Sequence, residues 1–274
     1  MRIDERIAEQ YADLSPQERR AADVLLAHLD DLAVYRAAEL AELAGVSKAT
    51  MSRLFRHLGF DDFTEVREHL RTLRSRGVPV TLEGAPSLTA HLEHEIANLQ
   101  KALVGMEESG GLDTAAKLIA EGQRVVVLGL RSSYPVALHL RQSLGQARLG
   151  VTLVPQPGQA LSDELIGLGK DDAAVVVAFR RRPDNVDGLL RILEDSGTPA
   201  VLIADPTARA LAARAEVWLE CPLTTDLAFD SYAVAMSVAA VLADRVLDLI
   251  GRPAEQRATD IDESYRALRE IENR

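Results

Sequence analysis

Residues 44–60, with the sequence AGVSKATMSRLFRHLGF, place hydroxyl and basic side chains just after a glycine. Arginine and lysine bind nucleic-acid phosphates, arginine also binds the guanine edge in the major groove, and serine and threonine contact phosphates. Met51, Leu54, Phe55 and Leu58 recur at helical spacing, which predicts a helix that buries one face and exposes the other. On the exposed face and at the helix N-terminus we expect the DNA-binding residues Ser47, Lys48, Ala49, Thr50, Ser52, Arg53 and Arg56.

The distribution of charge supports this interpretation. The chain has a net charge of −11, which argues against a protein that coats nucleic acid without sequence preference, because phosphate contacts need a basic surface. Residues 47–76 nevertheless hold 7 basic and 4 acidic residues. The basic region of this acidic chain therefore coincides with the predicted DNA-binding helix.

The elements that would position this helix are also helical. Across residues 14–76 the apolar side chains follow a helical period and no other. Residues 15–18, Ser-Pro-Gln-Glu, form a capping box with proline at the first helical position, which predicts a helix start. A second helix over 36–44 ends at Gly45, and a further helix opens at 61–66.

The spacing of these helices fits a helix-turn-helix, in which the second helix lays its N-terminal residues in the major groove. Ala41 is small where two helices would touch, Gly45 lies in the turn, and Val46 falls at a core position. The alternative is a three-helix bundle whose outer face is only solvated. The basic region favours the DNA-binding interpretation.

Beyond residue 87 apolar runs alternate with amphipathic stretches. The expected strands are 124–129, 151–154, 173–179, 199–204 and 215–220. The expected helices are 88–107, a second helix that ends near 120, and then 133–146, 160–168, 184–196, 206–213 and 229–250. Continuous apolar strands are typical of a parallel sheet buried on both faces, so this half should be a doubly wound α/β sandwich that binds ligands outside the carboxyl ends of its strands.

These patterns divide the chain. We expect a helix-turn-helix domain over 1–77, a linker with two prolines over 78–87, an α/β domain over 88–252 and a polar helical tail over 253–274.

The loop after the first expected strand, residues 129–133, is a candidate ligand loop. Its small residues let the backbone approach a ligand, and Ser132 and Ser133 offer hydroxyls at a helix N-terminus, where the dipole favours an anion. The alternative is an ordinary strand-to-helix turn. Asp205 and Asp230 follow later in similar places, where helix capping is the commoner role.

At this point the sequence resembles the RpiR family of bacterial transcriptional regulators, which join an N-terminal helix-turn-helix domain to a C-terminal sugar isomerase (SIS) domain. The residues that carry the resemblance are 14–23 (LSPQERRAAD), 38–50 (AELAELAGVSKAT) and 53–60 (RLFRHLGF). A looser resemblance extends over residues 125–250. It implies a SIS sandwich with five parallel strands, and a homodimer or homotetramer that binds palindromic double-stranded operator DNA and responds to a phosphorylated sugar.

The loop after the third expected strand departs from that family. SIS domains place a segment rich in serine and threonine there, whereas residues 179–184 read Phe-Arg-Arg-Arg-Pro-Asp. Guanidinium groups can bind phosphate or carboxylate in place of hydroxyls, so the ligand should still be a small anion. We expect Arg182 to be solvated and the effector-binding residues to be Gly129, Arg131, Ser132, Ser133, Arg180 and Arg181.

Two other classes of protein stay open from the sequence. A sugar-phosphate isomerase with an accessory helical domain would need an acid and a base, for which Asp163, Glu164 and His139 are available without a compelling spacing. An adaptor would use the helical domain for protein contacts.

We expect no catalytic residue, no metal and no cofactor. The single cysteine, Cys221, suits a small side chain near a strand end better than a nucleophile, and it can form no internal disulfide. The N-terminus has no apolar signal region, and no apolar run reaches the about 18 residues that span a membrane. We therefore expect a cytoplasmic protein without a membrane partner.

Overall fold

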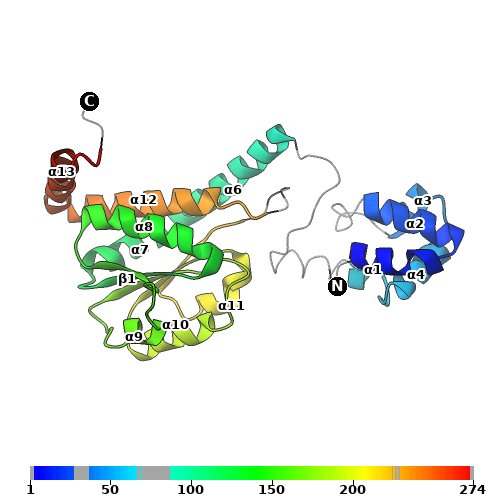
Figure 1. Ribbon diagram of the computed structural model, residues 1–274, viewed down its shortest axis with the longest axis horizontal. Helices are drawn as coiled ribbons and strands as arrows, with labels where there is room; N and C mark the ends of the chain where they lie inside the picture. The colour runs from blue at the N-terminus through cyan, green and yellow to red at the C-terminus, as the bar shows by residue number, and fades with distance from the viewer. Residues whose placement is uncertain are drawn as a thin grey trace. The chain divides into compact units, whose positions relative to one another are not determined.

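A computed structural model of the chain describes residues 3–27, 37–66, 69, 87–223, 225, 227 and 229–271. The chain forms two compact units, a helical N-terminal unit and a larger unit that begins at Thr89 (Figure 1).

The N-terminal unit consists of short helices. They are α1 (Ile3–Gln10), a 3-10 turn (Tyr11–Asp13), α2 (Pro16–Ala27), α3 (Ala37–Leu43), α4 (Lys48–His57) and a helical segment at 63–66. The predicted capping box starts α2, because the Ser15 N–H donates to Glu18 Oε2 at 3.0 Å and the Glu18 N–H donates to Ser15 Oγ at 3.3 Å. The linker predicted over 78–87 lies outside the described residues except for Ser87.

Helix α1 precedes the region that the sequence predicts to be helical. Ile3 and Ile7 lie one turn apart on it and are buried in the same core as Leu25, Leu40 and Leu54. Ile3 and Ile7 are the only large apolar residues among its 8 positions, too few for a clear helical period in the sequence. Tertiary packing, rather than local pattern, stabilises it.

The second unit is the predicted α/β sandwich. Its strands are β1 (Val125–Gly129), β2 (Val151–Val154), β3 (Ala173–Val177), β4 (Ala200–Ala204) and β5 (Val217–Glu220), all parallel, in the order β2-β1-β3-β4-β5. Every residue of β1, β3 and β4 is buried, as the continuous apolar runs predict.

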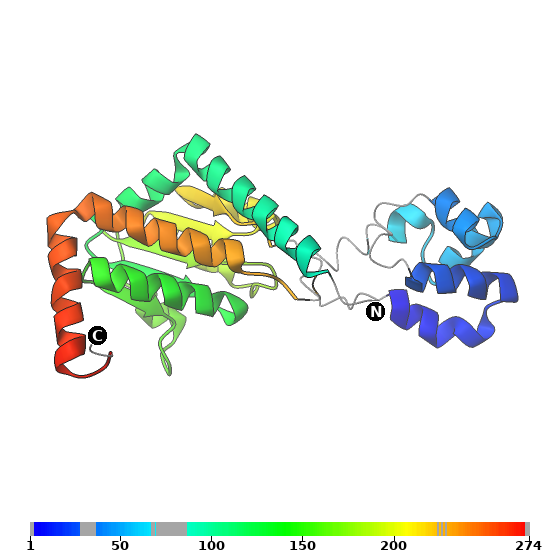
Figure 2. The same ribbon diagram turned by 90° about the horizontal axis from the view of Figure 1, so that it is seen from above.

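Helices cover both faces of this sheet. On one face lie α6 (Leu88–Ser109), α7 (Gly111–Glu121), α8 (Tyr134–Ala147) and α12 (Ala233–Ile250). On the other lie α9 (Leu161–Leu165), α10 (Val186–Asp195) and α11 (Arg209–Ala212) (Figures 1 and 2). Short 3-10 turns, η2 (Arg131–Ser133) and η3 (Pro206–Ala208), precede α8 and α11.

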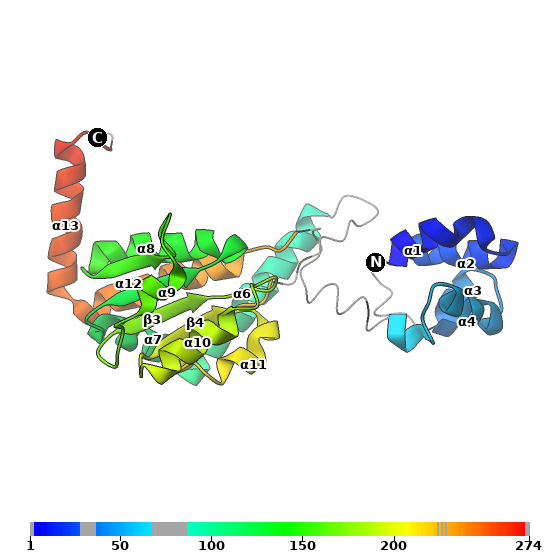
Figure 3. The ribbon, with the colours of Figure 1, turned by 60° about the horizontal axis from the view of Figure 1, so that its bottom comes forward.

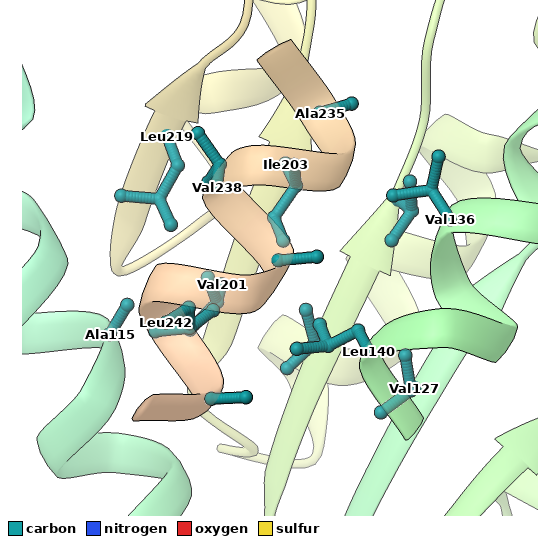
Figure 4. Packing of buried hydrophobic residues seen from close by; sticks show 14 of the residues in the cluster. Ala115, Val127, Val136, Leu140, Val201, Ile203, Leu219, Ala235, Val238 and Leu242 are labelled. Atoms are coloured by element: carbon teal, nitrogen blue, oxygen red, sulfur yellow. The ribbon is translucent and has the colours of Figure 1, made fainter. Parts of the chain in front are cut away.

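Helix α12 forms the centre of the larger core. Figure 4 shows Val238 and Leu242 of this helix lying against the strand residues Val201, Ile203 and Leu219. Because α12 packs along both α7 and α8, it fixes that layer as one block. The loops at the carboxyl ends of the strands therefore start from a rigid base.

The last helix, α13 (Arg252–Ala267), turns away from α12 at Gly251 (Figure 3). Ala254 is its only fully buried residue among those described. The Arg257 Nε donates to the Gly145 carbonyl at 3.0 Å, which ties α13 to the end of α8. None of the described helices has the length and apolar content needed to cross a membrane.

Candidate functional site

The turn between α3 and α4 has the geometry of a helix-turn-helix. Gly45 adopts a left-handed φ of 61°, which suits glycine after a helix end. The Val46 N–H donates to the Ala41 carbonyl at 2.9 Å and closes the turn. Ser47 then caps α4, since its Oγ accepts the Thr50 N–H at 3.1 Å.

Helix α4 divides its residues between two faces, as predicted. Met51, Leu54 and Phe55 are buried, and Leu58 follows them into the core. The outward residues are Ser47, Lys48, Ala49, Ser52, Arg53 and Arg56, all exposed. Within the described part of the chain no carboxylate pairs with Lys48, Arg53 or Arg56, so a row of uncompensated positive charge lies along this face.

Thr50 requires a correction. Its side chain is only 1% exposed, and its hydroxyl lies 2.9 Å from Ser47 Oγ. The position sits one turn before Leu54, on the buried side of the helix. Thr50 therefore completes the N-terminal cap of α4 and has no side-chain atom on the outer face.

The buried carboxylate of Glu18 joins α2 to α4. Besides its role in the capping box, Glu18 lies 3.2 Å from His57 Nδ1 through Oε1. The hydrogen bond from the Ser15 hydroxyl, followed by further hydrogen bonds from Ser15 and His57, holds the pKa of Glu18 below its usual range against the opposing effect of burial. This link fixes the C-terminal end of the outward-facing helix.

Arg6 also contacts the C-terminal end of α4. Its Nη1 donates to the Leu58 carbonyl at 2.7 Å, and its guanidinium lies 4.5 Å from the Phe60 ring centroid. A cation at a helix C-terminus satisfies free carbonyls and complements the helix dipole. The sequence alone does not predict this contact, because Arg6 precedes residues 14–76, over which the helical period of apolar side chains is clear.

At the carboxyl end of the sheet, the loops after β1 and β3 are fastened together. Ser133 is buried, and its Oγ accepts the Phe179 N–H at 3.1 Å. Its hydroxyl is thus used within the protein. Gly129 also has a packing role, since a Cβ there would lie 2.5 Å from the Ala137 Cβ. These two residues of the expected ligand set hold the loops in place.

Two arginines of the loop after β3 form buried ion pairs. Arg180, 16% exposed, donates through Nε to Asp230 Oδ1 at 2.9 Å. Arg182, 17% exposed, donates to Asp205 Oδ1 at 2.6 Å, and its Nε donates to the Ala178 carbonyl at 2.9 Å. Burial lowers the pKa of Arg182, and Asp205 opposes that effect.

These pairs revise the expectations for their members. Arg182 is a half-buried structural residue instead of a solvated one. Asp205 does cap η3, because its Oδ2 accepts the Thr207 N–H at 3.2 Å, but it also holds Arg182. Asp230 pairs with Arg180 and lies outside the helix, 3 residues before Ala233.

The remaining expected ligand residues lie on the surface. Arg131, Ser132 and Arg181 are exposed. Tyr232 lies beside Ser132, and its ring is 5.3 Å from that of Phe179. Burial raises the pKa of Tyr232, and a hydrogen bond with Ser132 acts in the opposite direction.

The cavity between these loops is small. It has a volume of about 10 Å³, lined by Gly129, Ser133, Arg182 and neighbouring apolar residues, and it holds about one water molecule. A ligand larger than a water molecule would therefore lie over the loops, outside this cavity. A cavity of about 630 Å³ lies elsewhere, between α8 and α13, but two of its arginines, Arg148 and Arg257, already bind backbone carbonyls.

The candidate acid and base residues of an isomerase do not converge. His139 lies within α8, Asp163 is exposed on α9, and Glu164 accepts the Gln156 N–H at 3.0 Å. Cys221 is buried, and burial raises the pKa of its thiol, which disfavours the nucleophilic thiolate. Over the described ranges, no three His, Cys, Asp or Glu side chains gather as a metal site would require.

Comparisons with known proteins match both units. Residues 1–76 match the family model described as "Helix-turn-helix domain, rpiR family", and residues 118–245 match the SIS domain model. The chain is 24% identical over 236 residues to the HTH-type transcriptional regulator HexR of Escherichia coli, covering 83% of this chain and 81% of that protein. It is 25% identical over 255 residues to HexR of Pseudomonas aeruginosa, covering 88% of each.

Solved structures share the fold. The sugar isomerase domain of an RpiR transcription factor from Sphaerobacter thermophilus superposes with a TM-score of 0.58 at 20% identity, over 63% of this chain and 96% of that one. The Vibrio vulnificus NanR protein, complexed with ManNAc-6P, superposes with a TM-score of 0.53 at 15% identity, over 97% of this chain and 99% of that one. The arrangement of a helical unit followed by a SIS-like sandwich therefore recurs in other proteins.

Proposed function

We propose, because this chain belongs to the rpiR family of helix-turn-helix regulators and carries a SIS domain, that it is a bacterial transcriptional regulator that binds operator DNA and senses an anionic sugar metabolite. In this proposal residues 1–77 are the DNA-binding domain and residues 88–252 bind the effector, which is a phosphosugar.

The observation that carries the proposal is the outward face of α4. Lys48, Arg53 and Arg56 are exposed there without a carboxylate partner, in a protein whose net charge is −11. A local row of free cations in an acidic protein suits an anionic partner. Duplex DNA is such an anion, and its major groove admits an α-helix. Ser47 and the first-turn N–H groups of α4 would hold a phosphate.

The regulator works as a homodimer or homotetramer in the cytoplasm, where its operator DNA lies. A two-fold dimer presents two reading heads to half-sites about one helical turn apart, or a multiple of that distance. A change in the spacing of the heads then alters operator affinity.

The effector lies at the carboxyl ends of the strands. In this proposal it contacts Arg131, Ser132 and an arginine of the loop after β3, Arg180 or Arg181, while Gly129 and Ser133 hold the loops. NanR, which shares the fold, is complexed with ManNAc-6P, and we extend that ligand class to this chain. Coupling between effector and operator is typically about 1–3 kcal/mol and acts equally in both directions.

The proposal is for a regulator and not for an isomerase. Isomerisation of a sugar requires a base placed beside the reacting carbon, with a second acid nearby. His139 lies on α8, whereas Asp163 and Glu164 lie on α9, which covers the opposite face of the sheet. Two relatives that match over 88% and 94% of both chains are named as HTH-type transcriptional regulators.

The test is a titration of the full chain onto DNA from upstream of its own gene at about 0.15 M salt, near physiological ionic strength. Unrelated DNA is the control, and sugar phosphates and sugar acids are added as a panel. Operator-specific binding that one compound shifts supports the proposal. Binding equal to the control, followed by an empty genome-wide fragment selection, contradicts DNA recognition, and turnover of the panel by the protein would then identify an isomerase.

A further inference from the structure

Four arginines lie in the loops at the carboxyl ends of β1 and β3. Two of them are paired with aspartates and two are not. Arg180 and Arg182 are paired with Asp230 and Asp205 and mostly buried. Arg131 and Arg181 are exposed and, within the described chain, form no hydrogen bond or ion pair through their side chains. Asp184 follows in the same loop as Arg181 but makes no ion pair with it.

The two unpaired arginines share an unusual backbone conformation. Arg131 has a φ of 53° and Arg181 a φ of 64°, in the left-handed region that favours glycine. A third residue of this kind, Arg269, follows α13, where a left-handed residue commonly ends a helix. Arg131 and Arg181 do not end helices, so the strain at these two positions needs another explanation. Strain of this kind concentrates at ligand sites.

The topology brings the two residues to one place. Strands β1 and β3 are neighbours, with Gly129 paired to Val177 in the register, and neighbouring strands lie about 4.8 Å apart. Arg131 follows Gly129 by two positions and Arg181 follows Val177 by four. The hydrogen bond between Ser133 and Phe179 joins the same two loops. Two long side chains therefore start from one rigid platform.

The number of unpaired arginines in these loops indicates the charge of the ligand that would bind there. Asp230 and Asp205 neutralise Arg180 and Arg182, which leaves two guanidinium charges without a partner. A phosphomonoester carries about −1.5 to −2 at neutral pH and binds arginine in a bidentate manner. A sugar carboxylate carries a single charge and would leave one arginine uncompensated.

We propose that Arg131 and Arg181 form a clamp for the doubly charged phosphate of a phosphomonoester, beside the Ser132 hydroxyl and the N-terminus of α8. Arg180 and Arg182 hold the loops and do not touch the ligand. This inference rests on the proposed function, which places the effector at this end of the sheet. It assigns the specificity for phosphate over carboxylate to two residues where SIS domains ordinarily use hydroxyls.

The test measures phosphate binding by the full chain with isothermal titration calorimetry at constant ionic strength. The probes are inorganic phosphate, glucose 6-phosphate, fructose 6-phosphate, ribose 5-phosphate and gluconate, the last of which carries only a carboxylate. The variants are Arg131→Gln and Arg181→Gln. The matched control is Arg141→Gln, because Arg141 is an exposed arginine of α8 that also lacks a partner in the described chain.

We expect phosphate compounds to bind the wild type at least about tenfold more tightly than gluconate, and each clamp variant to lose about tenfold, as for the removal of a hydrogen bond to a charged group. Arg141→Gln retains wild-type affinity. Circular dichroism melting of each variant separates loss of binding from loss of folding. If the sugar phosphates bind no tighter than inorganic phosphate, the clamp takes free phosphate.

Three results overturn the clamp. They are phosphate affinity that survives in both variants, affinity lost in Arg141→Gln instead, and no phosphate binding by the wild type. The operator titration distinguishes these from failure of the proposed function. If a phosphosugar changes operator binding by the wild type and by both clamp variants alike, the protein is a regulator but the clamp is wrong. If the wild type binds no operator, the proposed function itself is wrong.

Discussion

The outer face of α4 and the carboxyl end of the sheet both carry several arginines, but these differ in exposure and in pairing with carboxylates. On α4, Arg53 and Arg56 lie exposed with no carboxylate partner in the described chain. At the sheet, Arg180 and Arg182 are each half-buried against an aspartate. The difference shows that arginines which look alike in the sequence fall into two groups, one buried in ion pairs that join loops and one exposed without a carboxylate partner. Only the second should change binding without changing stability.

The largest effect that sharpens this comparison concerns the buried pairs. We expect Arg182→Gln to lower the free energy of unfolding by about 3–5 kcal/mol, because it leaves the Asp205 carboxylate buried without its partner. Arg181→Gln, one position away and exposed, should stay within about 0.5 kcal/mol of the wild type. Urea unfolding of both variants measures the contrast. Equal stabilities would show that the arginines of this loop are not two populations.

The next effect concerns the free arginines of α4. We expect Arg53→Ala to weaken operator binding by about 1–3 kcal/mol, the range for loss of an arginine contact to guanine. The free energy of unfolding should hardly change. Fluorescence anisotropy with labelled operator measures the loss, with Arg20→Ala, an exposed arginine of α2, as the matched control. A loss of the same size in the control would point to general charge rather than to the face of α4.

A smaller effect concerns Glu18, which joins α2 to α4 and should affect the stability of the protein. Glu18 has a lowered pKa in the folded protein, so its contribution to stability is present above the ordinary pKa of glutamate and is lost as the pH falls through and below that value. We expect Glu18→Gln to cost about 1 kcal/mol at neutral pH, as for a helix cap, and to flatten the decline in stability towards about pH 4. Unfolding curves across this range measure it. An unchanged pH dependence would contradict the role given to Glu18.

The smallest effect concerns Thr50, which the sequence places on the DNA-binding surface and the structure buries. We expect Thr50→Val to change operator affinity by less than about 0.5 kcal/mol. The same anisotropy titration measures it. A loss comparable with that of Arg53→Ala would return Thr50 to the interface.

How far the sequence predicts the molecule depends on the range of the interaction. The Ser15–Glu18 capping box and the buried runs of β1 and β3 were predictable, because residues three apart on a helix or consecutive on a strand are neighbours whatever the rest of the chain does. Helix α1 was not, since its two isoleucines gain their role from packing against distant helices.

The two candidate sites also differ in whether their interactions are local in the sequence or long-range. The face of α4 follows from the helical period alone, which also places Thr50 on the buried side, one turn before Leu54. At the sheet, the Arg180–Asp230 pair joins positions 50 apart and the Ser133–Phe179 hydrogen bond joins positions 46 apart. Nothing in the local sequence specifies these partners. The type of site and its loops could therefore be predicted, but not which arginines are free.

The central proposal is that an effector bound at the carboxyl ends of the strands changes the affinity of the helix-turn-helix domain for operator DNA. The most direct measurement is the affinity of the full chain for an active phosphosugar, determined by calorimetry with and without saturating operator DNA. We predict that operator changes the phosphosugar affinity by the same factor by which the phosphosugar changes operator affinity. Phosphosugar affinity that is identical with and without operator would contradict the account.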